Sequence, residues 1–569
     1  MYSGSFKQFL FSEDQLYALK KKGIAAELLS QSTDQETVNR VHKFLNDSGY
    51  STQLKLLYVT PERMAKSKRL MSALQKSYQN KKLERIAIDE VHCCSVLGHD
   101  FRPDYKYLGT LKTLFPNTPI IGVTATASRK VLLDVQKILN IRGCLIFNSP
   151  FNRPNLFYGV LEKPSDTEAV YDLLADLLKN RYAGQSGIIY TFSIKDTETL
   201  VSELLQRDCR VRPYHAQLEA NQRSKVYQKW MDNQIQAVVA TIAFGLGIDK
   251  PDCRFVIHHT LSKSMENFYQ ESGRCGRDGS YAECILLYKF SDMFKISTMT
   301  FAETNGLRNA YSMVNYCINA KKCRRDIFSN YFTEVWSEKN CGKMCDHCFY
   351  QKTVQPTKMD LSVHYRTLIK ILEKATSMDI KMTALKLIDA WFHKGPAKMR
   401  LEIPPPGIDR YFAEQIVAFM LIEDYLREDF HYTAYSTISY IQRGPNTPQD
   451  DEIEFFPSRI YELPPTKELE NFVRQTSAED SDECSFVSEK KLNLSRIKKR
   501  RVSSSDDSDS DAVSRSPYKS STIEEMIEKK VESKLRKIFG DAEENRASTS
   551  GDPDVLVIPP KKTEVIEID

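Results

Sequence analysis

Short apolar runs recur between residues 54 and 290, and each precedes a polar loop and a longer amphipathic segment. They are rich in valine and isoleucine, as in LKLLYVTPE, RIAIDE, PIIGVTATA, SGIIYTFS, QAVVATIAFG, RFVIHHT and CILLYKF. Continuous runs of this length are typical of parallel strands that helices cover on both faces. Buried helix segments are equally apolar, but the short length and β-branched content favour strands. The pattern therefore predicts an α/β fold built on parallel sheets.

Changes in composition divide the chain of 569 residues into several domains. The proline-containing NSPFNRPNL separates two groups of strands, a segment rich in cysteine and lysine follows residue 300, and a helical pattern resumes near residue 360. Beyond about residue 446 the sequence is polar and of low complexity, which predicts disorder. The predicted segments are 1–147, 148–300, 301–352, 353–445 and a disordered tail, 446–569.

The bulk composition limits the partners and the compartment. No run approaches the roughly 18 apolar residues of a membrane helix, and MYSGSFKQFLFSEDQ has no signal-peptide features. Thirteen cysteines, an odd number, fit a reducing compartment better than a disulfide framework. A net charge of +5 is too small to identify a nucleic-acid partner, so that inference has to come from local sites.

The sequence RIAIDEVHCC places two acids and a histidine at the end of a predicted strand, where open α/β sheets bind ligands. Asp89 would hold Mg²⁺, usually through water, and Glu90 would polarise the water that attacks the γ-phosphate of ATP. His92 would link this site to a second one. A solvated acidic strand end is the alternative, and these residues alone do not decide between the two.

Three motifs follow in order: VTATAS, VVATIAFGLGIDKPD with Gly247 and Asp249 after a strand, and QESGRCGRDG. From a helix start, Arg274 and Arg277 could both face a phosphate and stabilise the charge that develops during phosphoryl transfer. Scattered arginines on a surface helix are the alternative, but four motifs in this order favour a nucleotide site.

Four cysteines have the spacing C-x17-C-x3-C-x2-C, which suits tetrahedral Zn²⁺. Free core cysteines would not gather three within eight residues beside lysines. No open coordination position is implied, so the predicted zinc is structural. The predicted ligands are Cys323, Cys341, Cys345 and Cys348.

With these motifs the chain resembles the RecQ family of superfamily 2 DNA helicases, and most closely its short animal members. LLYVTPERMAKS, IAIDEVHCCS, TATAS, SPFNRPNLFY, YHAQLE, FVIHHTLSKSMENFYQESGRCGRDG, the cysteine cluster and LKLIDAWFHKGPAK carry the resemblance over about residues 12 to 445. It implies two RecA-like domains, a zinc-binding subdomain, a winged helix and ATP-driven 3′-to-5′ translocation along DNA. It also assigns Gln270 to the nucleotide site and all four zinc positions to cysteine.

The resemblance implies DNA contacts in two places. In the loop after the acidic strand His99, Phe101 and Arg102 keep the family register, but Val96 and Leu97 replace the glutamine and tryptophan that couple DNA binding to hydrolysis. In the winged helix, KGPAKMR offers three cations near a helix start, well placed for phosphates: Lys394, Lys398 and Arg400.

The stretch EDFHYTAYSTISYIQRG would form the hairpin of the winged helix, with Phe430 and Tyr432 near its tip. Aromatic residues in a hairpin are more often packed than inserted into a ligand. The resemblance favours Phe430 as a wedge that stacks on the terminal base pair of forked or partly single-stranded DNA.

The family's phosphate loop does not occur in these residues, because Gly342-Lys343 lies inside the cysteine cluster and is followed by Met344. The first strand of the first sheet is expected to be missing too, which truncates that domain and leaves an open edge. The sequence thus predicts either a DNA helicase of repair, recombination or replication, or a catalytically inactive truncated isoform that binds DNA or other proteins.

The tail carries three short signals. RIKKRR (496–501) predicts nuclear import, with a solvated basic patch as the alternative. STIEEMIEKKVESKLRKIFG (521–540) could form an amphipathic helix. DVLVIPP and EVIEID resemble peptides that bind SUMO by adding a strand to a sheet edge, although chance matches are common. The sequence leaves homo-oligomerisation open.

Overall fold

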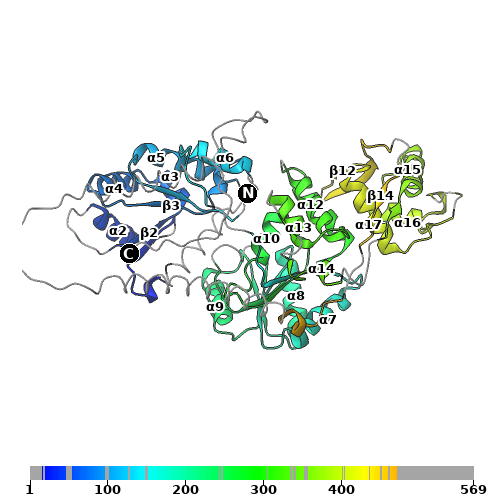
Figure 1. Cartoon of the computed structure of the whole chain (residues 1–569), viewed down its shortest axis with the longest axis horizontal. Coiled ribbons are helices and arrows are strands. Elements are labelled where there is room, and N and C mark those ends of the chain that lie inside the picture. Colours follow the sequence, from blue (N-terminus) through cyan, green and yellow to red (C-terminus); the bar gives the residue numbers. More distant parts are fainter. Residues whose placement is uncertain are drawn as a thin grey trace, which may run out of the picture. The chain divides into compact units, whose positions relative to one another are not determined.

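The computed structural model describes most of the chain up to residue 470 (Figure 1). None of the described helices is long and apolar enough to cross a membrane. The three tail signals lie outside the described residues. Those described are 16, 19–31, 33–46, 54–96, 101–125, 129–147, 151–242, 244, 248–303, 305–332, 336–337, 341–350, 357–399, 402, 404–434, 436–448, 452–458 and 462–470.

The first α/β region, residues 19–142, alternates short strands with helices. Its described strands form two parallel pairs, β1–β2 and β3–β4, and not one continuous sheet. Parallel strands usually bury both faces, yet Ile121 of β4 and the adjacent Val123 are 49% and 51% exposed. The elements are β1 Ala26–Leu29, α2 Gln35–Asn46, β2 Leu56–Val59, α3 Pro61–Lys66, α4 Lys68–Gln79, β3 Ile86–Ile88, η1 Val91–Cys94, η2 Pro103–Thr110, α5 Leu111–Leu114, β4 Ile120–Gly122 and α6 Arg129–Ile138.

The second α/β region contains the six-stranded parallel sheet that the apolar runs predicted, in the order β5-β10-β9-β6-β8-β7. Every residue of β6, β8 and β10 is buried, which confirms that helices cover both faces. The elements are β5 Leu156–Glu162, α7 Thr167–Asp176, η3 Leu177–Arg181, β6 Ser186–Tyr190, α8 Ile194–Gln206, β7 Val211–Tyr214, α9 Ala220–Met231, β8 Ala237–Ala240, β9 Cys253–His258, α10 Met265–Ser272 and β10 Ala282–Tyr288.

A helical module follows the sheet and carries the cysteine cluster. The sequence placed its start at residue 301, but α11 begins at Phe290 and packs against α12, so the module starts about ten residues earlier. The composition changes only after α11, which is why the boundary was predicted too late. The helices are α11 Phe290–Thr300, α12 Gly306–Ile318, α13 Arg324–Phe332 and α14 Asp346–Tyr350.

Three helices and an antiparallel hairpin follow, as expected for a winged helix. The third helix, α17, contacts α11, α12, α16 and β12, and none of its residues is fully exposed. This helix is therefore used for packing. The elements are β11 Met359–Asp360, α15 Ser362–Ser377, α16 Ala384–Trp391, η5 Ala397–Met399, α17 Arg410–Ile422, β12 Leu426–Tyr432, β13 Thr437–Arg443 and β14 Glu454–Phe455.

Ordered structure continues past residue 446, where the sequence predicted the tail to begin. Strand β14 pairs antiparallel with β11. The Gln415 side chain of α17 donates to the carbonyl of Ser458 at 2.9 Å and accepts from its backbone N–H at 2.8 Å. The prediction was wrong because it rested on the polar, low-complexity composition further along the tail, whereas Ile453 and Phe455 just beyond residue 446 are apolar and buried.

The described residues 462–470 then return to the second α/β region, and we call the described residues 452–458 and 462–470 the C-terminal strap. Arg181 donates to the carbonyl of Pro464 at 2.9 Å. Leu469 is completely buried in the same apolar cluster as Val170 and Leu174 of α7, and the orange segment beside α7 in Figure 1 is this part of the strap. The strap therefore joins the winged helix to the sheet.

Leu469→Ala should lower the free energy of unfolding of the second α/β region by about 2–5 kcal/mol, because it leaves a cavity in a packed core. The matched control is Leu205→Ala on α8, whose side chain is 43% exposed, for which we expect a change within about 0.5 kcal/mol. Hydrogen exchange of the β6 and β9 amides measures both. Equal effects would contradict a docked strap.

Candidate functional sites

The acidic motif lies at the carboxyl end of β3. Asp89 follows the strand, and its Oδ1 accepts a hydrogen bond from the Glu90 backbone N–H at 2.9 Å. Glu90 has a left-handed φ of 47°, which turns the chain sharply into η1 and is a conformation that functional sites often hold. Although solvent reaches Asp89, nearby protein atoms partly desolvate its carboxyl group and raise its pKa.

His92 joins this strand end to the next motif. Its imidazole is 2% exposed, and Nδ1 lies 2.9 Å from the Thr124 hydroxyl and 3.3 Å from Glu90 Oε2. Thr124 is the first threonine of VTATAS, which follows β4. The histidine therefore connects a carboxylate that could activate water with a second loop of the same region.

The two arginines of QESGRCGRDG lie beyond the end of α10 and not at a helix start, so that part of the prediction was wrong. Arg274 is buried and interacts with the Tyr190 hydroxyl. Arg277 is partly exposed, and its Nη1 pairs with Asp249 Oδ1 at 3.1 Å. The structure thus brings Arg277 and Asp249 together. Gln270 is half-buried on α10, and Gly247 lies outside the described residues.

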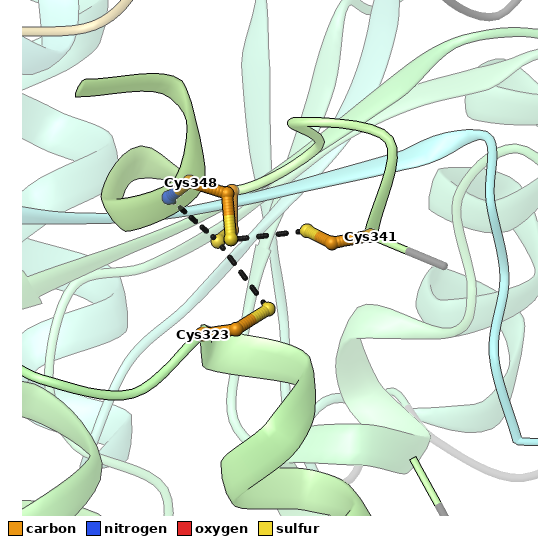
Figure 2. Close-up of side chains that lie close together, drawn as sticks. Cys323, Cys341 and Cys348 are labelled. Atoms are coloured by element: carbon orange, nitrogen blue, oxygen red, sulfur yellow. Dashed lines mark hydrogen bonds between the residues drawn. The ribbon is translucent and has the colours of Figure 1, made fainter. Parts of the chain in front are cut away.

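The four predicted zinc ligands converge from separate segments (Figure 2). Cys323 immediately precedes α13, Cys341 comes from a loop, and Cys348 lies on α14. Cys345 Sγ lies 3.8 Å from Cys323 Sγ and 3.7 Å from Cys341 Sγ. All four sulfur atoms lie within 4.8 Å of one another.

These distances fit a metal ion at the centre of the sulfur atoms. Tetrahedral coordination with Zn–S bonds of about 2.3 Å separates sulfur atoms by about 3.8 Å. His347 is not part of the group of converging ligand atoms, which are four cysteine sulfurs; its Nδ1 lies 2.7 Å from the Lys322 carbonyl oxygen. The cluster fits a structural Zn²⁺ ion.

Buried charges, which the sequence analysis did not identify, fix this cluster to the sheet. Asp346, between two zinc ligands, forms a bidentate ion pair with Arg324 at 2.9 and 3.0 Å. Asp346 also accepts from the backbone N–H of Val160 in β5 at 3.0 Å. Arg325 donates to the carbonyl groups of Arg153 and Leu156. The only signal in the sequence is that these charges flank the cysteines.

The structure changes the assignment of the first predicted DNA contacts. Arg102 is only 9% exposed, so it is not a free surface cation. Phe101 is half-buried, with the Lys106 ammonium 5.1 Å from the centre of its ring. His99 lies outside the described residues. Of the two described residues, Arg102 is therefore buried and Phe101 only half-exposed, so they do not form an open surface patch.

The basic segment of the winged helix is exposed, but it is not at the start of a long helix. Lys394 follows the end of α16, and Lys398 lies in the three-residue η5. A helix dipole therefore contributes nothing to phosphate binding here, and any contact relies on the ammonium groups themselves. Arg400 lies outside the described residues.

The predicted hairpin is present, but its aromatic residues have different roles from those expected. The Phe430 ring stacks on Phe301, with centroids 4.4 Å apart and an interplanar angle of 16°. The packed alternative is therefore correct for Phe430. Tyr432 is 76% exposed, with its ring centroid 5.7 Å from that of Phe301. Among the described residues of the hairpin, Tyr432 is thus the aromatic residue presented to solvent.

Three family models match the chain in consecutive segments. Residues 12–135 match the DEAD/DEAH box helicase model, residues 169–279 match the helicase conserved C-terminal domain, and residues 290–349 match the RecQ zinc-binding model. The first two matches fit ATP and Mg²⁺ as cofactors, and the third match contains all four cysteines and fits Zn²⁺.

Among curated proteins, ATP-dependent DNA helicase Q1 of Mus musculus is 52% identical over 76% of this chain. The Rattus norvegicus protein of the same name is 50% identical, and this chain covers 69% of it. The chain spans 66% of the length of the mouse relative. Among solved structures, Mycobacterium smegmatis helicase Lhr bound to single-stranded DNA and AMP-PNP is 18% identical, with a TM-score of 0.41 over 78% of this chain and 52% of that one.

Removing the zinc should unfold the helical module. Structural zinc contributes on the order of 10 kcal/mol to folding, so Cys345→Ser should lose the metal and the protection of the α12 and α13 amides from hydrogen exchange. Zinc released by a mercurial reagent should fall from one ion per chain to none. Cys144→Ser, which changes an exposed thiol outside the cluster, should keep the ion. Full retention of zinc by Cys345→Ser would contradict the assignment.

Proposed function

Because the chain belongs to the RecQ family of ATP-dependent DNA helicases, we propose that its residues serve 3′-to-5′ unwinding of forked or partly single-stranded DNA. The process would be repair, recombination or replication, in the nucleus. The observation that carries the proposal is the hairpin β12–β13, which packs against the zinc-bearing module and presents Tyr432 to solvent. An exposed aromatic ring at a rigid edge can stack on a base without a rearrangement.

The chemistry of the motor would be divided between the two α/β regions. Asp89 and Glu90 suit Mg²⁺ and the attacking water, and His92 ties them to Thr124. Arg277, now paired with Asp249 at 3.1 Å, could exchange that partner for a phosphate. Bound ATP would supply the free energy of translocation when it is hydrolysed, whereas the zinc ion is structural.

DNA would be held mainly by its phosphates. Exposed Lys394 and Lys398 lie in one segment of the winged helix, and the third helix is not available to read a groove because it is packed against the helical module. Affinity should therefore depend strongly on salt and little on sequence. Binding of SUMO through the tail and formation of a homo-oligomer stay predictions.

Tyr432→Ala should reduce base-pair opening at a fork junction about tenfold, because stacking on an aromatic ring contributes about 1–3 kcal/mol per base. The measurement is the fluorescence of 2-aminopurine in the first base pair of the junction, without nucleotide. DNA affinity, which depends on the phosphates, should change less than about threefold. Tyr435, which lies outside the described residues, is changed to Ala in parallel.

Phe430→Ala is the matched control, since it removes an aromatic residue two positions away that is stacked on Phe301. It should lower the stability of the hairpin as well as fork opening. If Phe430→Ala abolished opening without loss of stability, while Tyr432→Ala opened the junction normally, the assignment of the two rings would be reversed.

Glu90→Gln tests the nucleotide site. The 569 residues include the acidic strand and the arginine motif, but no Gly-Lys-Ser/Thr loop. We therefore expect a polypeptide of these residues to bind forked DNA and to hydrolyse no more ATP than its Glu90→Gln variant. Phosphate release stimulated by DNA measures this difference. Hydrolysis that depends on Glu90 would show that other residues hold the triphosphate, and would support the helicase proposal directly.

A further inference from the structure

Glu428 is a half-buried carboxylate on β12 with no role in the sites described above. It lies two residues before Phe430 and four before Tyr432, so the three side chains share one face of the strand. This face is turned toward the helical module, because Phe430 stacks on Phe301, the residue after α11. Glu428 therefore lies between the base of the hairpin and the module.

Three hydroxyl groups from three elements donate to this carboxylate. Ser297 of α11 donates to Oε2 at 2.6 Å, and Tyr311 of α12 donates to Oε1 at 2.8 Å. Ser439 of β13 also donates to Oε2, at 2.5 Å. Two of the three bonds thus cross from the hairpin to the module, whereas the third stays inside the hairpin.

The environment is unusual for an acidic residue. Burial raises the pKa of Glu428, and the three hydroxyl groups oppose the rise. Among the described residues no cation forms an ion pair with this carboxylate. Burying a charge without a counter-ion is unfavourable, so a neutral apolar contact would stabilise the fold more simply. The carboxylate instead fixes the orientation of the hairpin, because its two oxygen atoms accept hydrogen bonds from donors at fixed positions.

We propose that Glu428 is a positioning residue that fixes the hairpin to α11 and α12 and so sets where Tyr432 meets the DNA junction. The inference rests on the proposed function and deepens it, because it assigns the rigidity of the hairpin to one hydrogen-bonded carboxylate. The stacking of Phe430 on Phe301 is the second contact that fixes the hairpin to the helical module. A hairpin held only by its own strand pairing would change its orientation relative to the helical module. Its tip would then stack on a base in only a small fraction of these orientations.

The experiment distinguishes the attachment of the hairpin to the helical module from the folding of the hairpin itself. The test variant combines Ser297→Ala with Tyr311→Phe, which removes both bonds to the module and leaves Glu428 in place. The matched control is Ser439→Ala, which removes a bond to the same carboxylate within the hairpin. A second control, Asp429→Asn, changes the neighbouring carboxylate, which is bonded to His431 and Gln442.

For the full chain without nucleotide, the test variant and Glu428→Ala should reduce opening of the 2-aminopurine junction about tenfold, since two charge-assisted bonds are lost. The dissociation constant for forked DNA should stay within about twofold, because phosphate contacts set it. Ser439→Ala and Asp429→Asn should open the junction as the wild type does. Amides of β12 and β13 should exchange faster only in the test variant and in Glu428→Ala.

Normal opening by the test variant would overturn the inference, and so would an equal loss of opening and DNA affinity, which marks a general loss of structure. If Tyr432→Ala opens the junction normally, the proposed wedge is wrong, and only the hydrogen-exchange data test whether Glu428 fixes the hairpin to the module. Faster exchange in the test variant, but not in Ser439→Ala, would then still support that role of Glu428. Unchanged exchange would refute it.

Discussion

The buried ion pair between Arg324 and Asp346 holds the molecule's second half together. Asp346 lies between two zinc ligands and accepts from the backbone of β5, while Arg324 begins the helix that follows Cys323. Neither charge reaches water, so breaking the pair would leave an uncompensated charge in the core. The zinc cluster, the sheet and the helical module therefore have to be assembled together, and every element beyond them depends on that assembly.

The hairpin is one of the elements that depend on this assembly. It contacts the module through the Glu428 carboxylate and through Phe430 on Phe301, and the C-terminal strap ties the winged helix back to the sheet. The third helix of the winged helix packs against the helical module and the hairpin. In the proposed function, DNA contact is thereby left to the hairpin tip and to exposed lysines, which would bind a junction by its shape and charge and would not read a sequence.

Local patterns predicted the strands, the zinc ligands and the hairpin, because each depends on residues close together in the chain. The acidic motif and His92 were also identified in this way. What the sequence could not supply were contacts between distant residues. Phe430 was expected to be free because nothing near it indicates Phe301, and Arg102 was expected at a surface that its neighbours cover. The strap was missed because its apolar side chains, such as Phe455 and Leu469, pack only against distant elements, and the polar composition further along the chain dominated the prediction.

The arginine motif is connected by packed helices to the helical module that holds the hairpin. Helix α10 carries Gln270 and leads to Arg274, and it packs on α13, which begins beside the first zinc ligand. The rings of Phe268 and Phe328 stack between these helices, and Tyr331 donates to Glu266 at 2.8 Å. Packed cores move as units and do not deform continuously. In the proposed motor, a displacement of the arginine motif on nucleotide binding would therefore move the helical module as well, and with that module the hairpin proposed to meet the junction.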